Sequence, residues 1–131
     1  MTVPDERLFA LIVEDEPDSA EIVTRILDFY KRSYRCVVSA EEAVAFLAVQ
    51  RPQIIIADLA LPKMTGWDLL HYIRTTPQLA YLPVIAVTAH YSPRVAREGK
   101  DLGFDAMLPK PFDTRSFIEE LDRLVEHASQ D

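Results

Sequence analysis

Short apolar runs alternate along the chain with longer segments whose apolar residues recur at helical spacing. The apolar runs predict strands near 7–13, 34–38, 53–57, 83–87 and 105–109. The periodic segments predict helices near 17–32, 40–50, 65–75, 93–102 and 113–127. This alternation is typical of βαβ units and predicts an α/β fold with a parallel sheet. Runs such as Ile54-Ile55-Ile56 do not alternate with polar residues, as expected of strands covered on both faces.

The predicted helices begin with residues that commonly cap helices. A hydroxyl or carboxylate at the first position accepts a hydrogen bond from a free backbone N–H. The capping candidates are Ser39, Thr65, Ser92 and Asp113. Apolar stripes at helical spacing predict the buried faces of the first and last helices. These stripes consist of Ile22, Ile26 and Phe29, and of Phe117, Leu121 and Leu124.

Length and charge limit the possible classes of protein. The 131 residues, 49% hydrophobic and 27% charged, predict a single globular domain over 1–131. The net charge of −7 argues against direct binding to nucleic acid, which needs clustered Lys and Arg. The single cysteine, Cys36, excludes an intrachain disulfide, and we expect it to pack in a strand as a small apolar residue.

The sequence shows neither a signal peptide nor a long uncharged apolar stretch. We therefore expect a cytoplasmic protein that does not bind membranes. Because the last predicted helix ends close to the end of the sequence, we also expect no attached output domain. The sequence leaves the oligomeric state open.

Reactive side chains follow four of the predicted strands. Glu14 and Asp15 follow the first strand, Asp58 the third, Thr88 the fourth and Lys110 the fifth. In an open parallel sheet, ligands bind outside the carboxyl ends of the strands. We therefore expect these carboxylates, the hydroxyl and the ammonium to converge on one small site.

This set of groups suits a divalent cation and a phosphoryl group. Carboxylates favour Mg²⁺, which commonly shares its site with phosphate, and Asp15 and Asp58 are the best ligand candidates, with Glu14 beside them. A carboxylate can also act as a nucleophile and form an aspartyl phosphate. Mg²⁺ and the Lys110 ammonium would offset the charge on the transferring oxygens, and Thr88 would donate its hydroxyl to one of them.

Each of these residues also has an ordinary structural interpretation. Asp58 taken alone would most often be a helix cap, Thr88 a turn residue, and Lys110 a solvated lysine. Lys110-Pro111 has two interpretations as well. A cis bond would turn the chain sharply and aim Lys110 at the site, whereas a trans proline would only end the strand. The equivalent position of all these groups at strand ends favours the functional interpretation.

The motifs resemble those of the receiver domain of bacterial two-component response regulators, the family that includes the chemotaxis regulator. They follow the family's order and spacing over nearly the whole chain. The matching segments are Leu11 to Glu16 (LIVEDE), Ile56 to Pro62 (IADLALP), Met64 to Trp67 (MTGW), Val87 to Ala89 (VTA) and Gly103 to Phe112 (GFDAMLPKPF). The resemblance implies a flavodoxin-like, doubly wound sheet of five parallel strands in the order 2-1-3-4-5, with five helices.

The resemblance also implies roles for the site residues. Asp58 would be the phosphoacceptor, Thr88 the switch hydroxyl, and Lys110 the phosphate-binding ammonium, preceding a cis proline bond. The implied ligands of Mg²⁺ are Glu14 (mostly through water), Asp15, Asp58 and the main-chain carbonyl of Ala60.

The implied function is that of a stand-alone response regulator in a phosphorelay. A sensor histidine kinase or a histidine phosphotransfer protein would phosphorylate Asp58. This would switch a partner-binding face for a downstream protein, made by the helix near 93–102, the strand near 105–109 and the helix near 113–127 (the helix 4, strand 5 and helix 5 face). Beyond transfer to Asp58 and hydrolysis from it, we expect no enzyme activity.

Four residues depart from the family's common pattern or vary within it. Met107 occupies a position where the family often has an aromatic ring that turns inward on activation, and we expect an ordinary core role for it. Glu14 replaces the commoner Asp, so the first side chain of the acidic pair is longer. Ala60 and His90 stand at positions that the family associates with dephosphorylation rate, and His90 either influences that rate or is a solvated loop residue.

Three alternatives remain open at this point. The chain could be a receiver-like interaction module that is never phosphorylated, or a receiver fragment of a larger regulator or hybrid kinase. It could also be an enzyme of the haloacid dehalogenase type, which uses an aspartate nucleophile with Mg²⁺. Such an enzyme needs a second acid two residues after the nucleophile, where this chain has Ala60.

Overall fold

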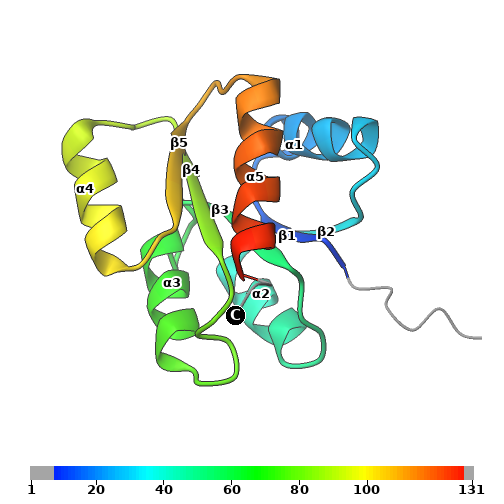
Figure 1. The fold of residues 1–131 in the computed structure, drawn as a ribbon. Coiled ribbons are helices and arrows are strands. Elements are labelled where there is room, and N and C mark those ends of the chain that lie inside the picture. The colour runs from blue at the N-terminus through cyan, green and yellow to red at the C-terminus, as the bar shows by residue number, and fades with distance from the viewer. Residues whose placement is uncertain (1–7, 129–131) are drawn as a thin grey trace, which may run out of the picture.

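The computed structural model describes residues 8–128 and contains one five-stranded sheet (Figure 1). All neighbouring strands pair in parallel, in the order β2-β1-β3-β4-β5. This confirms the predicted doubly wound topology. The strands are β1 (Ala10–Val13), β2 (Tyr34–Val37), β3 (Ile54–Asp58), β4 (Val84–Thr88) and β5 (Ala106–Pro109).

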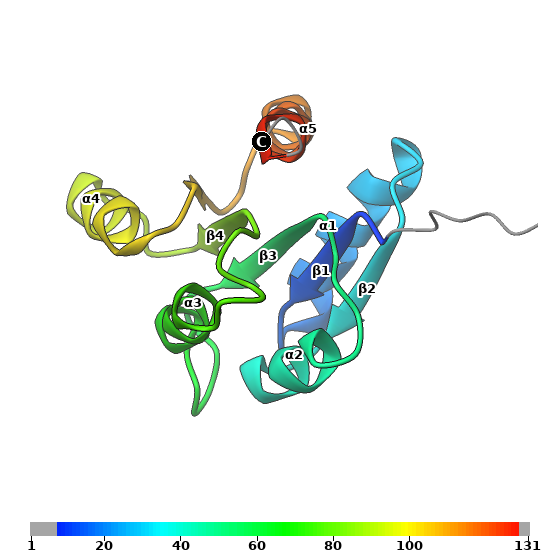
Figure 2. The ribbon, with the colours of Figure 1, turned by 60° about the horizontal axis from the view of Figure 1, so that its bottom comes forward.

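Helices cover both faces of this sheet (Figure 2). Helices α1 and α5 pack on one face, and α2 and α3 pack on the other, where α4 lies beside β5. The helices are α1 (Pro17–Phe29), α2 (Ala40–Leu47), α3 (Gly66–Thr75), α4 (Pro93–Leu102) and α5 (Thr114–Ala128).

The central strand β3 explains why its sequence does not alternate. Ile54 and Ile56 belong to the core between the sheet and helices α1 and α5. Ile55 and Ala57 belong to the core on the other face, with α2 and α3. Successive side chains of a strand point to opposite faces, so a strand with two covered faces needs apolar residues at every position.

The predicted helix caps are confirmed by hydrogen bonds. Ser39 accepts from the Glu42 N–H, Ser92 from the Val95 N–H and Asp113 from the Ser116 N–H. Thr65 forms the complete reciprocal arrangement with Asp68, in which each side chain accepts from the other's backbone N–H. These bonds fix the starts of the helices that follow the strands. The predicted beginning of the first strand, at residue 7, lies outside the described residues.

Two predictions about burial are wrong. Ile22 and Phe29 of α1 are 55% and 76% exposed, and the buried face of this helix consists of Val23, Ile26 and Leu27. Cys36 is exposed rather than packed as an apolar residue. It lies on β2, the strand at the edge of the sheet, where coverage by neighbouring elements is incomplete.

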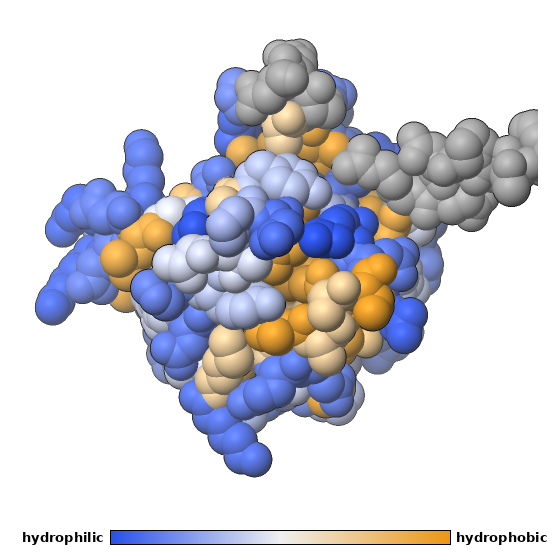
Figure 3. Space-filling view, turned by 90° about the horizontal axis from the view of Figure 1, so that it is seen from below, coloured by the Kyte–Doolittle hydropathy of each residue, from blue (hydrophilic) through white to orange (hydrophobic). Residues whose placement is uncertain are grey.

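The surface at the end of the sheet opposite the carboxyl ends of the strands is predominantly hydrophilic, with smaller hydrophobic patches (Figure 3). Among residues 8–128, no helix is both long enough and apolar enough to span a bilayer.

Two glycines with different neighbours give a first test of the packing. A Cβ at Gly66 would lie 2.5 Å from the carbonyl oxygen of Asp58, whereas a Cβ at Gly99 would meet the terminal methyl of Met107 at 2.2 Å. Backbone cannot move aside cheaply, but the end of a methionine side chain can. We therefore expect Gly66→Ala to lower the free energy of unfolding by roughly 1–3 kcal/mol.

Gly99→Ala is the matched control, and its free energy of unfolding should stay close to that of the wild type. Alanine is favoured over glycine inside a helix by about 1 kcal/mol, which offsets the rearrangement of Met107. Urea denaturation of both variants and the wild type measures these free energies of unfolding. If both variants lost the same free energy of unfolding, the result would contradict the close approach of α3 to the end of β3.

Candidate functional site

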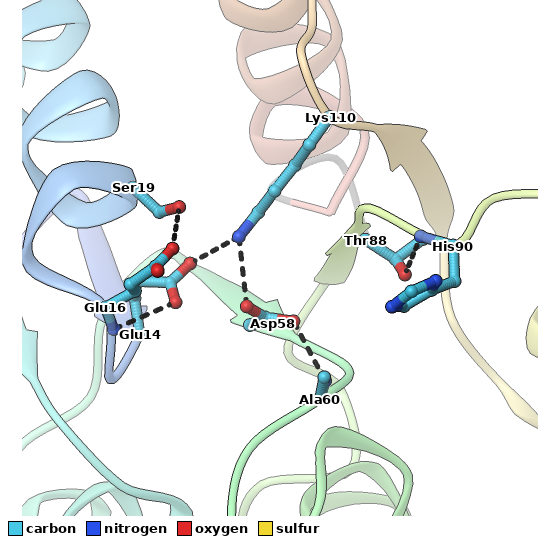
Figure 4. A network of polar contacts seen from close by, with 8 residues as sticks. All are labelled: Glu14, Glu16, Ser19, Asp58, Ala60, Thr88, His90 and Lys110. Atoms are coloured by element: carbon cyan, nitrogen blue, oxygen red, sulfur yellow. Dashed lines mark hydrogen bonds and ion pairs between the residues drawn. The ribbon is translucent and has the colours of Figure 1, made fainter.

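The carboxyl ends of four strands bring the predicted site residues together (Figure 4). Glu14 follows β1, Asp58 ends β3, Thr88 ends β4 and Lys110 follows β5. Strands β1, β3, β4 and β5 are consecutive neighbours in the sheet, so their ends line one edge. The convergence predicted from the sequence is therefore present in the structure.

The Lys110 ammonium lies between two buried carboxylates. Its Nζ donates to Oε1 of Glu14 at 2.8 Å and to Oδ2 of Asp58 at 3.0 Å. Glu14 and Asp58 are only 4% and 8% exposed. Buried carboxylates are stable in the charged form only when paired and hydrogen-bonded, so this lysine is required for both.

Backbone N–H groups satisfy the other oxygens of the two acids. Oδ1 of Asp58 accepts from the Ala60 N–H at 2.8 Å, and Oε2 of Glu14 accepts from the Glu16 N–H at 3.2 Å. Among the described residues, no buried side-chain nitrogen or oxygen lacks a hydrogen-bond partner. Each carboxylate oxygen of Glu14 and Asp58 thus has a hydrogen-bond partner.

These contacts shift the pKa values of the three groups in different directions. Burial raises the pKa of Glu14, and the Lys110 ammonium only partly opposes this. Burial also acts to raise the pKa of Asp58, but the Ala60 N–H and Lys110 together lower it further, so its pKa lies below the ordinary value. Burial acts to lower the pKa of Lys110, but the two carboxylates raise it above the usual value. Asp58 is therefore ionised at neutral pH.

Three carboxylates gather closely enough to hold a metal ion. Glu14, Asp15 and Asp58 each offer an oxygen, and these oxygens lie within 4.8 Å of one another. Asp15 is exposed, whereas the other two acids are buried. Ala60 contacts Asp58 through its N–H, and the predicted metal role of its carbonyl stays a prediction.

Thr88 and His90 form the other side of the site. Thr88 is 2% exposed, and its Oγ1 accepts from the His90 N–H at 3.0 Å. Figure 4 shows the exposed imidazole of His90 beside the Thr88 hydroxyl. His90 thus lies at the rim of the site, and its effect on dephosphorylation stays a prediction.

Of three further features of the site, one was predicted from the sequence and two were not. The Lys110–Pro111 peptide bond is cis, as the family resemblance implied. The Ala60 N–H that holds Asp58 and the close approach of Gly66 to the Asp58 carbonyl were not predicted. The glycine directly after the Thr65 cap was the available signal, because a residue without Cβ permits such an approach.

Comparison with known proteins identifies the family. The chain matches the model of the response regulator receiver domain over residues 10–122, and it therefore belongs to this family. It is 31% identical over 116 residues to an uncharacterized 14.6 kDa protein of Leptolyngbya boryana, covering 88% of this chain and 86% of that protein. It also matches mycobacterial response regulators of which it spans about half the length.

Solved structures agree with this assignment. The signal receiver domain of a signal transduction histidine kinase from Syntrophus aciditrophicus is 33% identical, with a TM-score of 0.82 over 90% of this chain and 89% of that one. The receiver domain of the sensor histidine kinase PA1611 from Pseudomonas aeruginosa PAO1 is 26% identical, with a TM-score of 0.82 over 92% and 98%. That structure holds a magnesium ion coordinated in its active-site cleft.

Removal of the Lys110 charge tests the electrostatics of the site. In Lys110→Met, we expect the pKa values of both Glu14 and Asp58 to rise, because the ammonium lowers both in the wild type. The folded variant then binds more protons than its unfolded chain. Its free energy of unfolding should therefore fall as the pH rises from about 4 to 7.

At pH 7 the free energy of unfolding of Lys110→Met should be roughly 1–3 kcal/mol lower than that of the wild type, as expected for buried groups left without a partner. Carboxyl NMR titrations and urea denaturation at several pH values measure the two effects. Lys100→Met, at an exposed position of α4, is the control and should change neither. Unaltered carboxyl titrations in Lys110→Met would show that the ammonium does not govern the site.

Proposed function

We propose that this receiver domain is a phosphorylation switch whose phosphoacceptor is Asp58. The observation that supports this most directly is the state of the Asp58 carboxylate. It is buried and ionised at the carboxyl end of β3, where the Ala60 N–H holds one oxygen and the Lys110 ammonium the other. A carboxylate oxygen held in this way is oriented for attack on phosphorus.

The phosphoryl donor would be a phosphohistidine on a sensor histidine kinase or a histidine phosphotransfer protein. An oxygen of Asp58 forms a bond to phosphorus as the bond between phosphorus and the imidazole nitrogen breaks. The bonding electrons leave with the imidazole, which takes up a proton. Lys110 would hold a phosphoryl oxygen throughout, since its ammonium already contacts Asp58.

The acidic residues fit a magnesium ion. Three carboxylates face a single ammonium, so the site has excess negative charge that a hard cation would offset. Glu14, Asp15, Asp58 and the carbonyl of Ala60 would hold it. When bound, Mg²⁺ supplies positive charge to the transferring oxygens. The magnesium ion in the similar receiver domain of PA1611 supports this choice of metal.

The phosphorylated state would then alter the surface made by α4, β5 and α5. Thr88 and Lys110 would bind the phosphoryl oxygens, and their movement would bias the loops that lead into α4 and α5. A downstream protein would bind this surface with different affinity in the two states. We place this activity in the cytoplasm, without direct nucleic-acid or membrane binding, and propose no chemistry beyond self-phosphorylation and hydrolysis.

The competing functions have less support. A haloacid dehalogenase-type enzyme needs an acid where this chain has Ala60. A receiver-like module that is never phosphorylated has no need of a buried lysine shared by two buried acids. We propose a stand-alone receiver, and a receiver cut from a longer regulator would use the same site chemistry.

The central experiment is phosphorylation with acetyl phosphate and Mg²⁺, followed by intact-mass measurement. The wild type should gain one phosphoryl group, and Asp58→Asn should gain none, because the amide is a poor nucleophile. Asp101→Asn, an exposed position on α4, is the control and should label as the wild type does. Labelling of Asp58→Asn to the wild-type level would eliminate Asp58 as the phosphoacceptor.

A second experiment tests the metal. Asp15→Asn should weaken Mg²⁺ binding at least tenfold, or about 1.4 kcal/mol, because a charged ligand is lost from a cation that has few protein ligands. Isothermal titration calorimetry measures the affinity. Asp18→Asn, in the first turn of α1 and outside the acidic cluster, is the control. Equal affinities in the Asp15 variant and the wild type would refute the ligand assignment.

A further inference from the structure

A groove of about 470 Å³ lies between helices α3 and α4, and it is lined by both apolar and acidic side chains. Trp67 of α3 and Leu102 of α4 supply the apolar part, and Glu98 and Asp101 of α4 supply two carboxylates. Within the described part of the chain, the lining residues all belong to α3 and α4, and none belongs to the phosphorylation site. The groove is therefore separate from the chemistry proposed for Asp58.

The apolar side chains of the groove are already positioned for contact with a partner. Trp67 packs edge-on against Phe104, with ring centroids 5.5 Å apart and an angle of 69° between the rings. Trp67 also packs against the hydrophobic core, yet it is only half-buried. Leu102 is 63% exposed. A partner that covered these two side chains would gain apolar burial without first having to order the indole ring.

The two carboxylates of the groove have little positive charge to offset them. The ion-pair partner of Glu98 is Arg94, at a distance of 4.0 Å, and their side chains are 54% and 82% exposed. Such a long and exposed pair contributes little. Within residues 8–128, Asp101 makes no hydrogen bond or ion pair. Both carboxylates are therefore available to a cation supplied by another molecule.

We propose that this groove binds a basic, apolar segment of a partner protein, in which an arginine stacks on Trp67 and pairs with the two carboxylates. A guanidinium group is flat, stacks on an indole face and forms paired hydrogen bonds with carboxylates. An aliphatic neighbour of this arginine would cover Leu102. Acidic segments and nucleic acid would be repelled by the same carboxylates. The groove lies outside the phosphorylation site, so binding does not require a phosphorylated Asp58.

The test uses the whole chain, with no phosphoryl donor present, and a synthetic probe peptide. The probe is a pentapeptide, capped at both ends, that alternates leucine with arginine, and two control peptides carry glutamine or glutamate in place of arginine. Trp67 is the only tryptophan in the sequence, so its fluorescence reports on the groove directly.

We expect a saturable change in Trp67 fluorescence with the arginine peptide, affinity roughly fivefold lower for the glutamine peptide, and no binding of the glutamate peptide. The arginine peptide would lose both its stacking and its charge pairs when glutamine replaces arginine. The absence of saturable binding of the arginine peptide, or equal affinity for the glutamine peptide, would overturn the proposal.

Two double variants with the same change in charge separate binding in the groove from general attraction to an acidic protein. Glu98→Gln combined with Asp101→Asn should lower the affinity for the arginine peptide roughly tenfold, because both carboxylates of the groove are lost. Glu119→Gln combined with Asp18→Asn is the matched control and should bind as the wild type does. Glu119, like Glu98, pairs with an arginine four residues before it. Equal weakening in the two double variants would show that net charge alone attracts the peptide, and the site would be refuted.

The apolar part of the groove is tested by Leu102→Ser. This side chain is largely exposed, so the fold should be retained, and an unaltered urea midpoint checks this. The affinity for the arginine peptide should fall roughly threefold or more, because apolar burial is lost. Val49→Ser, at an 81% exposed position after α2, is the control and should bind as the wild type does. Wild-type affinity in Leu102→Ser would contradict the proposed docking of an apolar segment.

Discussion

The ion pairs of Lys110 with Glu14 and Asp58 are the interaction on which the rest of the site depends. Two carboxylates are buried at the edge of the sheet, and each would repel the other without the ammonium between them. The order of the strands makes this arrangement possible, because β1 and β3 are neighbours and only β4 separates β3 from β5. A side chain as long as lysine can then reach across β4 to both acids.

The same interaction leaves the site short of positive charge. Asp15 adds a third carboxylate, and Lys110 is the one ammonium that contacts the buried pair in the described part of the chain. This deficit explains physically why a small, hard cation suits the site, and why the proposed phosphoryl transfer would need one. A cation relieves the repulsion among the acids, and the lysine is then available to a phosphoryl oxygen.

The helices around the site differ in how firmly they are held. Helix α5 is tied to the turn after α1 by the two hydrogen bonds between Arg32 and Asp122. Helix α4 is anchored mainly at its C-terminal end, where the Arg74 guanidinium donates to the Gly103 carbonyl and to Asp105. Its N-terminal end, nearest the site, has few buried side chains. The N-terminal end is therefore the less firmly packed end of this helix.

The sequence by itself determined the class of fold and the members of the site, because these follow from local patterns. Apolar runs mark strands, caps such as Thr65 mark helix starts, and parallel topology places strand ends together. Tertiary structure alone decided which face of α1 is buried, since Ile22 and Phe29 fit the helical period as well as Val23 does. It also decided the exposure of Cys36, the hydrogen bond from Ala60 to Asp58, and the packing of Met107 against Gly99. These depend on distances between elements far apart in the chain, and periodicity and spacing along a sequence contain no such distances.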